Sequence, residues 1–97
     1  MSKGATEYLR QATVIQENRA KEYDTPGGER SMASIVGAFN VLFDKNLTET
    51  EGWQFMVLLK MRRQHSAPTH HEDSALDEVS YSALAAESSS REDTPKG

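Results

Sequence analysis

Apolar side chains recur every three or four residues in four stretches of the chain, which is the spacing of helices with one buried face. The predicted helices cover approximately residues 6–22, 29–44, 49–64 and 74–87. No stretch shows the two-residue alternation of a strand, and no segment is repeated. We therefore expect an all-α fold, in which residues 1–87 form one small domain with a compact four-helix bundle.

The second predicted helix carries its apolar residues as a stripe that we expect to face the core. The members of this stripe are Met32, Ile35, Val36, Phe39, Leu42 and Phe43. Gly37 lies in the middle of the helix and costs roughly 1 kcal/mol relative to alanine, so close helix packing is expected there as compensation. Because residues 45–47 form a short connection, the third helix should run antiparallel to the second.

The third predicted helix is apolar around nearly its whole circumference. Its large apolar residues are Trp53, Phe55, Met56, Val57, Leu58, Leu59 and Met61. A helix of this kind is buried by its neighbours, so we expect it at the centre of the domain. Thr48 and Glu51 have the spacing of a capping box, in which each side chain accepts from the backbone amide of the other residue. They are predicted to begin this helix.

The composition of the chain changes after the fourth predicted helix. Residues 88–97 contain no large apolar side chain, so they cannot offset the entropy of ordering and are predicted to form a disordered polar tail. The helix before this tail is expected to begin near Asp73 or Ser74. Ser74 and Asp77 have the spacing of a capping-box variant.

Length and composition exclude several classes of protein. The chain has 97 residues, enough for one domain, and it lacks the cysteines needed for disulfides, thiolate zinc sites or thiol nucleophiles. No apolar stretch approaches the ~20 residues of a membrane span, and no secretory signal is visible. We expect a cytoplasmic protein without membrane contact. Its apolar content of 36% predicts a small core, which association into a homo-oligomer would help to complete.

The formal net charge of −4, from 11 basic and 15 acidic residues, is unevenly distributed. Residues 72–97 hold seven acidic and two basic side chains, a net of −5, so the remainder carries +1. An acidic chain lacks the cationic surface with which proteins neutralise phosphate groups. The composition therefore argues against nucleic acid as a partner.

Basic and acidic side chains are expected to meet where the third and fourth helices pack. Lys60 and Arg63 share one face of the third helix. Asp73, Asp77 and Tyr81 follow at four-residue intervals on the fourth. One interpretation is a phosphate site, in which the two cations bind the anion and the two aspartates hold Mg²⁺. The other is structural, with Asp77 neutralising Arg63 in a half-buried ion pair.

His71 and Ser74 lie next to these residues in the sequence and complete the candidate polar cluster. His71 is also one of three histidines near a single loop, with His65 and His70. Their spacing is not that of a helical zinc pair, so we interpret them as solvated loop residues. No cofactor is expected, except Mg²⁺ under the phosphate interpretation.

Two runs of sequence resemble a small phage and prophage family, the domain of unknown function 6378. The first is Met-Val-Leu-Leu-Lys-x-x-Arg at residues 56–63, and the second is His-x-Asp-Ser-x-x-Asp-x-x-x-Tyr at residues 71–81. The resemblance extends over about residues 8–87 and implies a compact helical protein in a phage context, and hence a location in the host cytoplasm. The positions that it carries over are Lys60, Arg63, His71, Asp73, Ser74, Asp77 and Tyr81.

The helical plan and the late acidic residues are also similar to the MazG-like all-α nucleotide pyrophosphohydrolases. Such enzymes gather carboxylates on Mg²⁺ from a Glu-x-x-Glu pair and a Glu-x-x-Asp pair. The third predicted helix has no Glu-x-x-Glu. We therefore expect a small phage-type accessory protein that acts without catalysis by binding a host or phage protein. The alternative is an Mg²⁺-dependent nucleotide-binding protein or MazG-like pyrophosphohydrolase.

Overall fold

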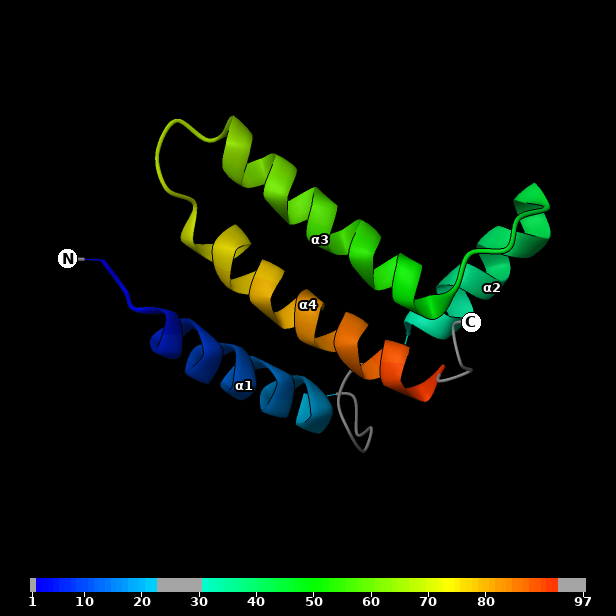
Figure 1. Ribbon diagram of the computed structural model, residues 1–97, viewed down its shortest axis with the longest axis horizontal. Coiled ribbons are helices and arrows are strands. Elements are labelled where there is room, and N and C mark those ends of the chain that lie inside the picture. The colour runs from blue at the N-terminus through cyan, green and yellow to red at the C-terminus, as the bar shows by residue number, and fades with distance from the viewer. Residues whose placement is uncertain (1, 23–30, 93–97) are drawn as a thin grey trace.

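The computed structural model describes residues 2–22 and 31–92, and within them the only regular secondary structure is helical. Four helices follow one another along the chain (Figure 1). Their bounds are α1 Ala5–Glu22, α2 Met32–Phe43, α3 Glu49–Ser66 and α4 Glu72–Arg91. The all-α prediction is confirmed, and the helices of the described residues begin and end within a few positions of their predicted bounds.

Helix α4 is the central element of the fold. It lies between α1 and α3 in a layer of three helices, running parallel to α1 and antiparallel to α3 (Figure 1). The prediction that the third helix would be central is wrong, because several of its apolar side chains, including Phe55 and Leu58, are exposed. Helix α4 instead buries the small side chains Ser74, Ser80 and Ala85, which allow neighbouring helices to approach on both of its sides.

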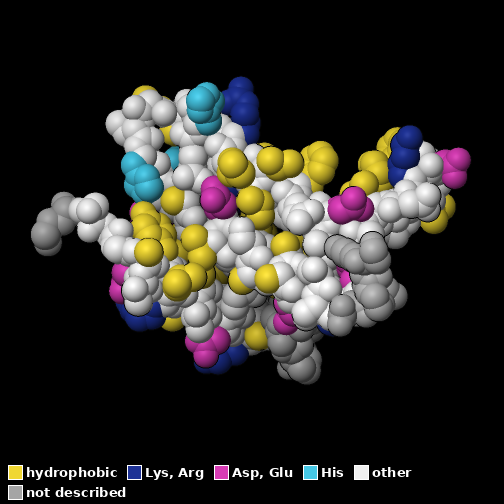
Figure 2. All heavy atoms as spheres, in the orientation of Figure 1, with side chains coloured by type: hydrophobic (Ala, Val, Ile, Leu, Met, Phe, Trp, Pro, Cys, Tyr) yellow, Lys and Arg dark blue, Asp and Glu magenta, His cyan; other side chains and the backbone are white. Residues whose placement is uncertain are grey.

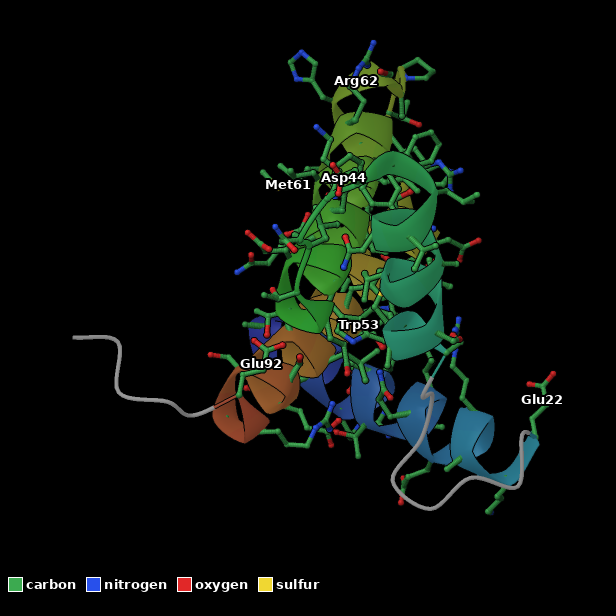
Figure 3. All side chains as sticks on the ribbon, turned by 90° about the vertical axis from the view of Figure 1, so that its right-hand side faces the viewer. Glu22, Asp44, Trp53, Met61, Arg62 and Glu92 are labelled. Carbon is green, nitrogen blue, oxygen red and sulfur yellow. The ribbon has the colours of Figure 1, made fainter. Side chains whose placement is uncertain are left out.

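The apolar core lies at the junction of α2, α3 and α4. Its buried members are Met32, Val36, Trp53, Leu84 and Ala85, with Leu47, Met56 and Tyr81 packed against them. Trp53 is at the centre of this junction (Figure 3). Its ring stacks on that of Tyr81, with 5.7 Å between the ring centroids. This ring contact joins α3 to α4 within the core.

Helix α2 projects away from the layer of three helices, and it does not pack antiparallel along α3 as predicted (Figure 1). The connection after α2 turns back along that helix, because Asp44 adopts a left-handed conformation with φ of 54°. The Asn40 amide then pairs with Leu47, donating to its carbonyl oxygen at 2.9 Å and accepting from its N–H at 2.8 Å. Of the predicted core stripe of α2, only Met32 and Val36 are buried.

The glycine that permits close helix packing is Gly52 of α3, not Gly37 as predicted. A β-carbon at Gly52 would lie 2.5 Å from Sδ of Met32 and 2.8 Å from Cγ1 of Val36. A β-carbon at Gly37 would meet nothing within 4 Å. The N-terminal half of α2 therefore rests directly on the backbone of α3.

The capping box predicted at the start of α3 is confirmed. Thr48 Oγ1 accepts from the Glu51 N–H at 3.0 Å, and Glu51 Oε1 accepts from the Thr48 N–H at 2.9 Å. The start of α4 differs from the prediction, because the capping residue is His71 and not Ser74. Ser74 lies one turn inside the helix and is buried.

The predicted start of the disordered tail, at residue 88, is too early in the sequence. Helix α4 continues through Ser88, which is 1% exposed, to Arg91. Ser88 can be buried because its hydroxyl pairs with Thr50 Oγ1 at 2.9 Å and with Glu92 Oε1 at 3.1 Å. The rest of the predicted tail, residues 93–97, lies outside the described residues. Among the described helices, none combines the length and apolar character needed to cross a membrane.

Candidate functional site

The predicted meeting of charges between α3 and α4 is present, but its cation is Lys60. Lys60 Nζ lies 3.0 Å from Asp77 Oδ2, and the two side chains are 11% and 25% exposed. The same ammonium lies 5.9 Å from the centroid of the Tyr81 ring, which stacks on Trp53. Lys60, Asp77 and Tyr81 therefore form one polar seam that borders the apolar core.

Arg63 does not join this seam. Its side chain is exposed, and within the described residues it makes no hydrogen bond or ion pair. The ion pair predicted between Arg63 and Asp77 is made by Lys60 instead, because Lys60 follows Trp53 by seven positions and therefore lies on the same face of α3. The two predicted phosphate ligands therefore do not converge.

The two aspartates proposed for Mg²⁺ are also poorly placed for that role. Asp77 is engaged by Lys60, and Asp73 is exposed one turn before it. No group of three histidine, aspartate or glutamate side chains in residues 2–22 and 31–92 could hold a metal ion. Asp77 would have to give up its ion pair with Lys60 to bind Mg²⁺, so this arrangement gives little support to the Mg²⁺ site of the phosphate interpretation.

The remaining members of the candidate cluster separate into two places. His71 and Ser74 form the N-terminal cap of α4, in which His71 Nδ1 accepts from the Ser74 N–H at 3.3 Å and lies 2.7 Å from Ser74 Oγ. Tyr81 lies two turns further along α4, beside Trp53. His71 and Ser74 thus satisfy free backbone and hydroxyl groups at a helix end, which is a structural task.

A polar clasp that sequence reasoning missed joins the first residues to the start of α4. We call Lys3, Tyr8, His70 and Glu72 the N-terminal clasp. Lys3 Nζ pairs with Glu72 Oε2, and the Tyr8 hydroxyl donates to Glu72 Oε1 at 2.8 Å. His70 Nε2 lies 3.1 Å from the Tyr8 hydroxyl oxygen and 3.1 Å from Glu72 Oε1. Hydrogen bonds from Lys3, Tyr8 and His70 lower the pKa of Glu72 from 4.5 to about 2. The hydrogen bond to Glu72 in turn raises the pKa of Tyr8.

A second clasp joins the end of α4 to the start of α3. Glu92 accepts from the backbone N–H of Thr50 at 3.2 Å and from the Thr50 hydroxyl at 2.8 Å. Arg91 lies beside it and pairs with Glu49 at 2.6 Å and with Glu87 at 3.0 Å. Because the first backbone amides of a helix have no partner within the helix, a carboxylate at this position stabilises α3. The two clasps lie at opposite ends of α4.

The exposed side of α4 forms the floor of a trough between α1 and α3, which was also missed. Two hollows of about 640 and 600 Å³ meet at Ser82, the first between α1 and α4 and the second between α3 and α4. Their floor consists of α4 residues, and their walls include Leu9 of α1 and Leu58 of α3. Figure 2 shows hydrophobic side chains gathered on this face, over the boundary of α1 and α4. We call this feature the α4 trough.

The chain matches the family described as domain of unknown function 6378 over residues 7–89. It belongs to this family. The matched residues of the DUF6378 domain include nearly all of α1, the whole of α2 and α3, and most of α4. The polar seam and the α4 trough therefore both lie within the family region. No curated protein and no solved structure matched the chain.

The two clasps of this DUF6378 domain extend beyond the matched residues. Lys3 precedes residue 7, and both Arg91 and Glu92 follow residue 89. Their signal in the sequence is weak, because their partners are distant: Lys3 and Glu72 are separated by 69 positions, and Thr50 and Glu92 by 42. Neither spacing corresponds to a local motif.

Proposed function

We propose that this DUF6378 protein is a non-catalytic accessory protein that acts by binding another protein. The partner places a helix in the α4 trough. In the phage context that the family resemblance implies, the partner is a host or phage protein in the host cytoplasm. The observation that carries the proposal is the trough itself.

The floor of the trough suits a helix because its side chains are short. Ser82, Ala83 and Ala86 are exposed on α4 and project little beyond the backbone, whereas Leu9 and Leu58 rise on either side. A helix with side chains is about 10–12 Å across. Short residues along a groove let such a helix approach the backbone of α4 and pack its own larger apolar residues against the walls. The trough thus favours an amphipathic helix over a small ligand.

The charges around the trough favour a basic partner. Glu17 of α1 and Glu78 of α4 line the hollow between these two helices. Helix α4 begins with Glu72 and Asp73, and residues 72–97 carry a net charge of −5. Complementary charge at the edge of an interface speeds association and selects among partners. We therefore propose that the bound helix carries lysine or arginine next to its apolar stripe.

The polar seam gives less support to the alternative, an Mg²⁺-dependent nucleotide-binding protein or pyrophosphohydrolase. Its cation, Lys60, is paired with Asp77, and the Arg63 side chain is exposed and does not pair with Asp77. A nucleotide would have to displace an existing ion pair to reach Lys60. Thermal unfolding with nucleoside triphosphates and Mg²⁺ tests this alternative separately, because a ligand that binds the folded state raises its melting temperature.

The experiment for the preferred function compares Ser82→Arg with Thr69→Arg in affinity capture from host cells with and without phage. Ser82 is exposed where the two hollows meet, so arginine fills the trough without disturbing the core. Thr69 is exposed in the loop between α3 and α4, and arginine there adds the same charge away from the trough. We expect the unchanged chain and Thr69→Arg to capture the same partner protein. Ser82→Arg should no longer capture it.

Cross-linking then identifies the surface of the retained partner. The proposal requires a cross-link between a basic helix of the partner and Glu78 or Glu17 of the trough. The proposal that a partner binds the α4 trough would be wrong if all three chains captured the same proteins. It would also be wrong if none of them captured any protein.

A further inference from the structure

Helix α2 is an apolar helix that is exposed along most of its length. Its 12 residues include no charged side chain. Only Met32 and Val36 are buried, both in its N-terminal half, whereas Val41 is 84% and Leu42 is 75% exposed. A helix that is apolar on all sides is normally covered by neighbours. In α2 the C-terminal half projects beyond the other helices (Figure 1).

A second apolar patch lies on α3 on the side that α2 contacts. Phe55 and Leu59 follow Gly52 by three and seven positions, so helical periodicity places them on the same side of α3 as Gly52. Both are exposed. In Figure 2 hydrophobic side chains lie along this edge of α3 and on α2 across from it. We define the α2–α3 apolar surface by its exposed members Ile35, Phe39, Val41, Leu42, Phe43, Phe55 and Leu59.

The position of α2 is fixed by contacts within the chain. Asn40 holds the return segment through both hydrogen bonds to Leu47, and Gly52 brings α3 into direct contact with Met32. Because the Asn40 amide already has partners, covering this surface would leave no unpaired amide there. The α2–α3 apolar surface is therefore preformed and suited to burial without water.

We propose that a second copy of this chain covers the α2–α3 apolar surface. If the roughly 150–250 Å² of an aromatic side chain is taken for every member, the exposed fractions of 37–84% in this set amount to at most an area on the order of 800 Å². It is comparable with the ~800 Å² that each partner contributes to a stable interface. A two-fold dimer needs a surface that is complementary to itself, and an uncharged apolar helix meets that need without like-charge repulsion.

The chain has little else with which to cover this surface. The positions outside the described ranges are residues 1, 23–30 and 93–97, and their only large apolar side chains are Met1 and Tyr23. The surface also differs from the α4 trough, because none of its seven members lines either hollow. Self-association through α2 therefore stands independently of the proposed partner helix.

Sedimentation over a micromolar concentration series tests the proposal with Leu42→Glu and Val14→Glu. Both positions are exposed in the single chain, so both variants should keep their helical circular dichroism. The unchanged chain should sediment at twice its mass of 10.8 kDa. We expect Leu42→Glu to weaken the dimer at least about 100-fold, because two buried charges of like sign would face each other, and Val14→Glu to leave it unchanged.

A second measurement requires no added charge. The chain has no cysteine, so Leu42→Cys and Val14→Cys each introduce a single thiol. Labelling of Leu42→Cys by a maleimide should slow as the protein concentration rises, whereas Val14→Cys should react at a constant rate. A single-chain mass for the unchanged protein at every concentration would overturn the proposal. So would equal weakening by the two glutamate variants, or equal labelling rates at the two thiols.

Discussion

Gly52 of α3 lies against Met32 of α2 at a distance that leaves no room for a side chain. A β-carbon built on Gly52 would be 2.5 Å from the Met32 sulfur, well inside van der Waals contact. The same methionine and its neighbour Val36 are the only buried residues of α2. The tightest contact between α2 and the backbone of α3 is therefore the one at Gly52.

Replacing Gly52 with alanine should detach or displace α2. We expect Gly52→Ala to lower the free energy of unfolding by about 1–3 kcal/mol, the usual cost of overpacking a tight contact. The matched control is Gly37→Ala, whose β-carbon meets nothing within 4 Å. It should raise the free energy of unfolding by about 0.5–1 kcal/mol through helix propensity. Urea unfolding of both variants checks the prediction, and a loss of similar size in both would contradict it.

The ion pair between Lys60 and Asp77 should contribute to stability. Asp77→Asn leaves a largely buried ammonium without its counter-charge, so we expect the free energy of unfolding to fall by about 1–3 kcal/mol. Asp73→Asn is the control on the same helix, and it should cost less than about 1 kcal/mol because Asp73 is exposed and contributes only near the helix end. Denaturant unfolding of the two variants gives the comparison. Equal losses of unfolding free energy in the two variants would show that the ion pair between Lys60 and Asp77 does not stabilise the fold.

The N-terminal clasp should make the thermal stability of the protein depend on pH. The pKa of Glu72 falls from 4.5 to about 2 on folding, so its contribution is complete above pH 4.5 and disappears as the pH falls through about 2. In Glu72→Gln the group does not titrate. The melting temperatures of the two proteins should therefore differ at neutral pH and converge in this acidic range. A difference that stays constant down to pH 2 would mean that Glu72 is not held by Lys3, Tyr8 and His70.

Glu92 should stabilise α3 although it lies beyond the end of α4. Glu92→Ala removes the acceptor for the Thr50 N–H and hydroxyl, and we expect a loss of about 1–2 kcal/mol, as for other helix caps. Glu92→Gln keeps an oxygen acceptor without the charge, so its loss should be smaller. Thermal unfolding and amide exchange at Thr50 measure both effects. Unchanged exchange at Thr50 in Glu92→Ala would rule out the cap.

The helices themselves were predictable from the sequence, because their signals are local. Periodic apolar residues and the pair Thr48 and Glu51 identify α3 and its first residue. The central position of α4 was not predictable in this way. Periodicity shows that the face of α3 with Phe55 is apolar, but it does not show whether another helix covers that face. Small residues such as Ser74 and Ser88 gave no hydrophobic signal, and yet they are the most deeply buried side chains.

The candidate site was predicted in part for a similar reason. Helical spacing brought Lys60 and Asp77 to one seam, as the structure has them. The same spacing allowed Arg63 equally well, because a pattern of three or four residues does not fix how one helix is rotated against another. The clasps of Lys3 and Glu92 arise only from the tertiary arrangement. A single sequence contains no local signal for them.

The cap that Glu92 places on α3 bears on how this family is best produced for experiments. A recombinant fragment cut to the matched residues 7–89 would keep every helix but would lose Glu92 and its neighbour Arg91 at one end and Lys3 at the other. The backbone N–H of Thr50, in the first turn of α3, would then lack the Glu92 carboxylate as its acceptor. We expect such a fragment to be less stable than the protein it represents. Expression boundaries for this protein are therefore better placed beyond Glu92 than at the end of the matched region.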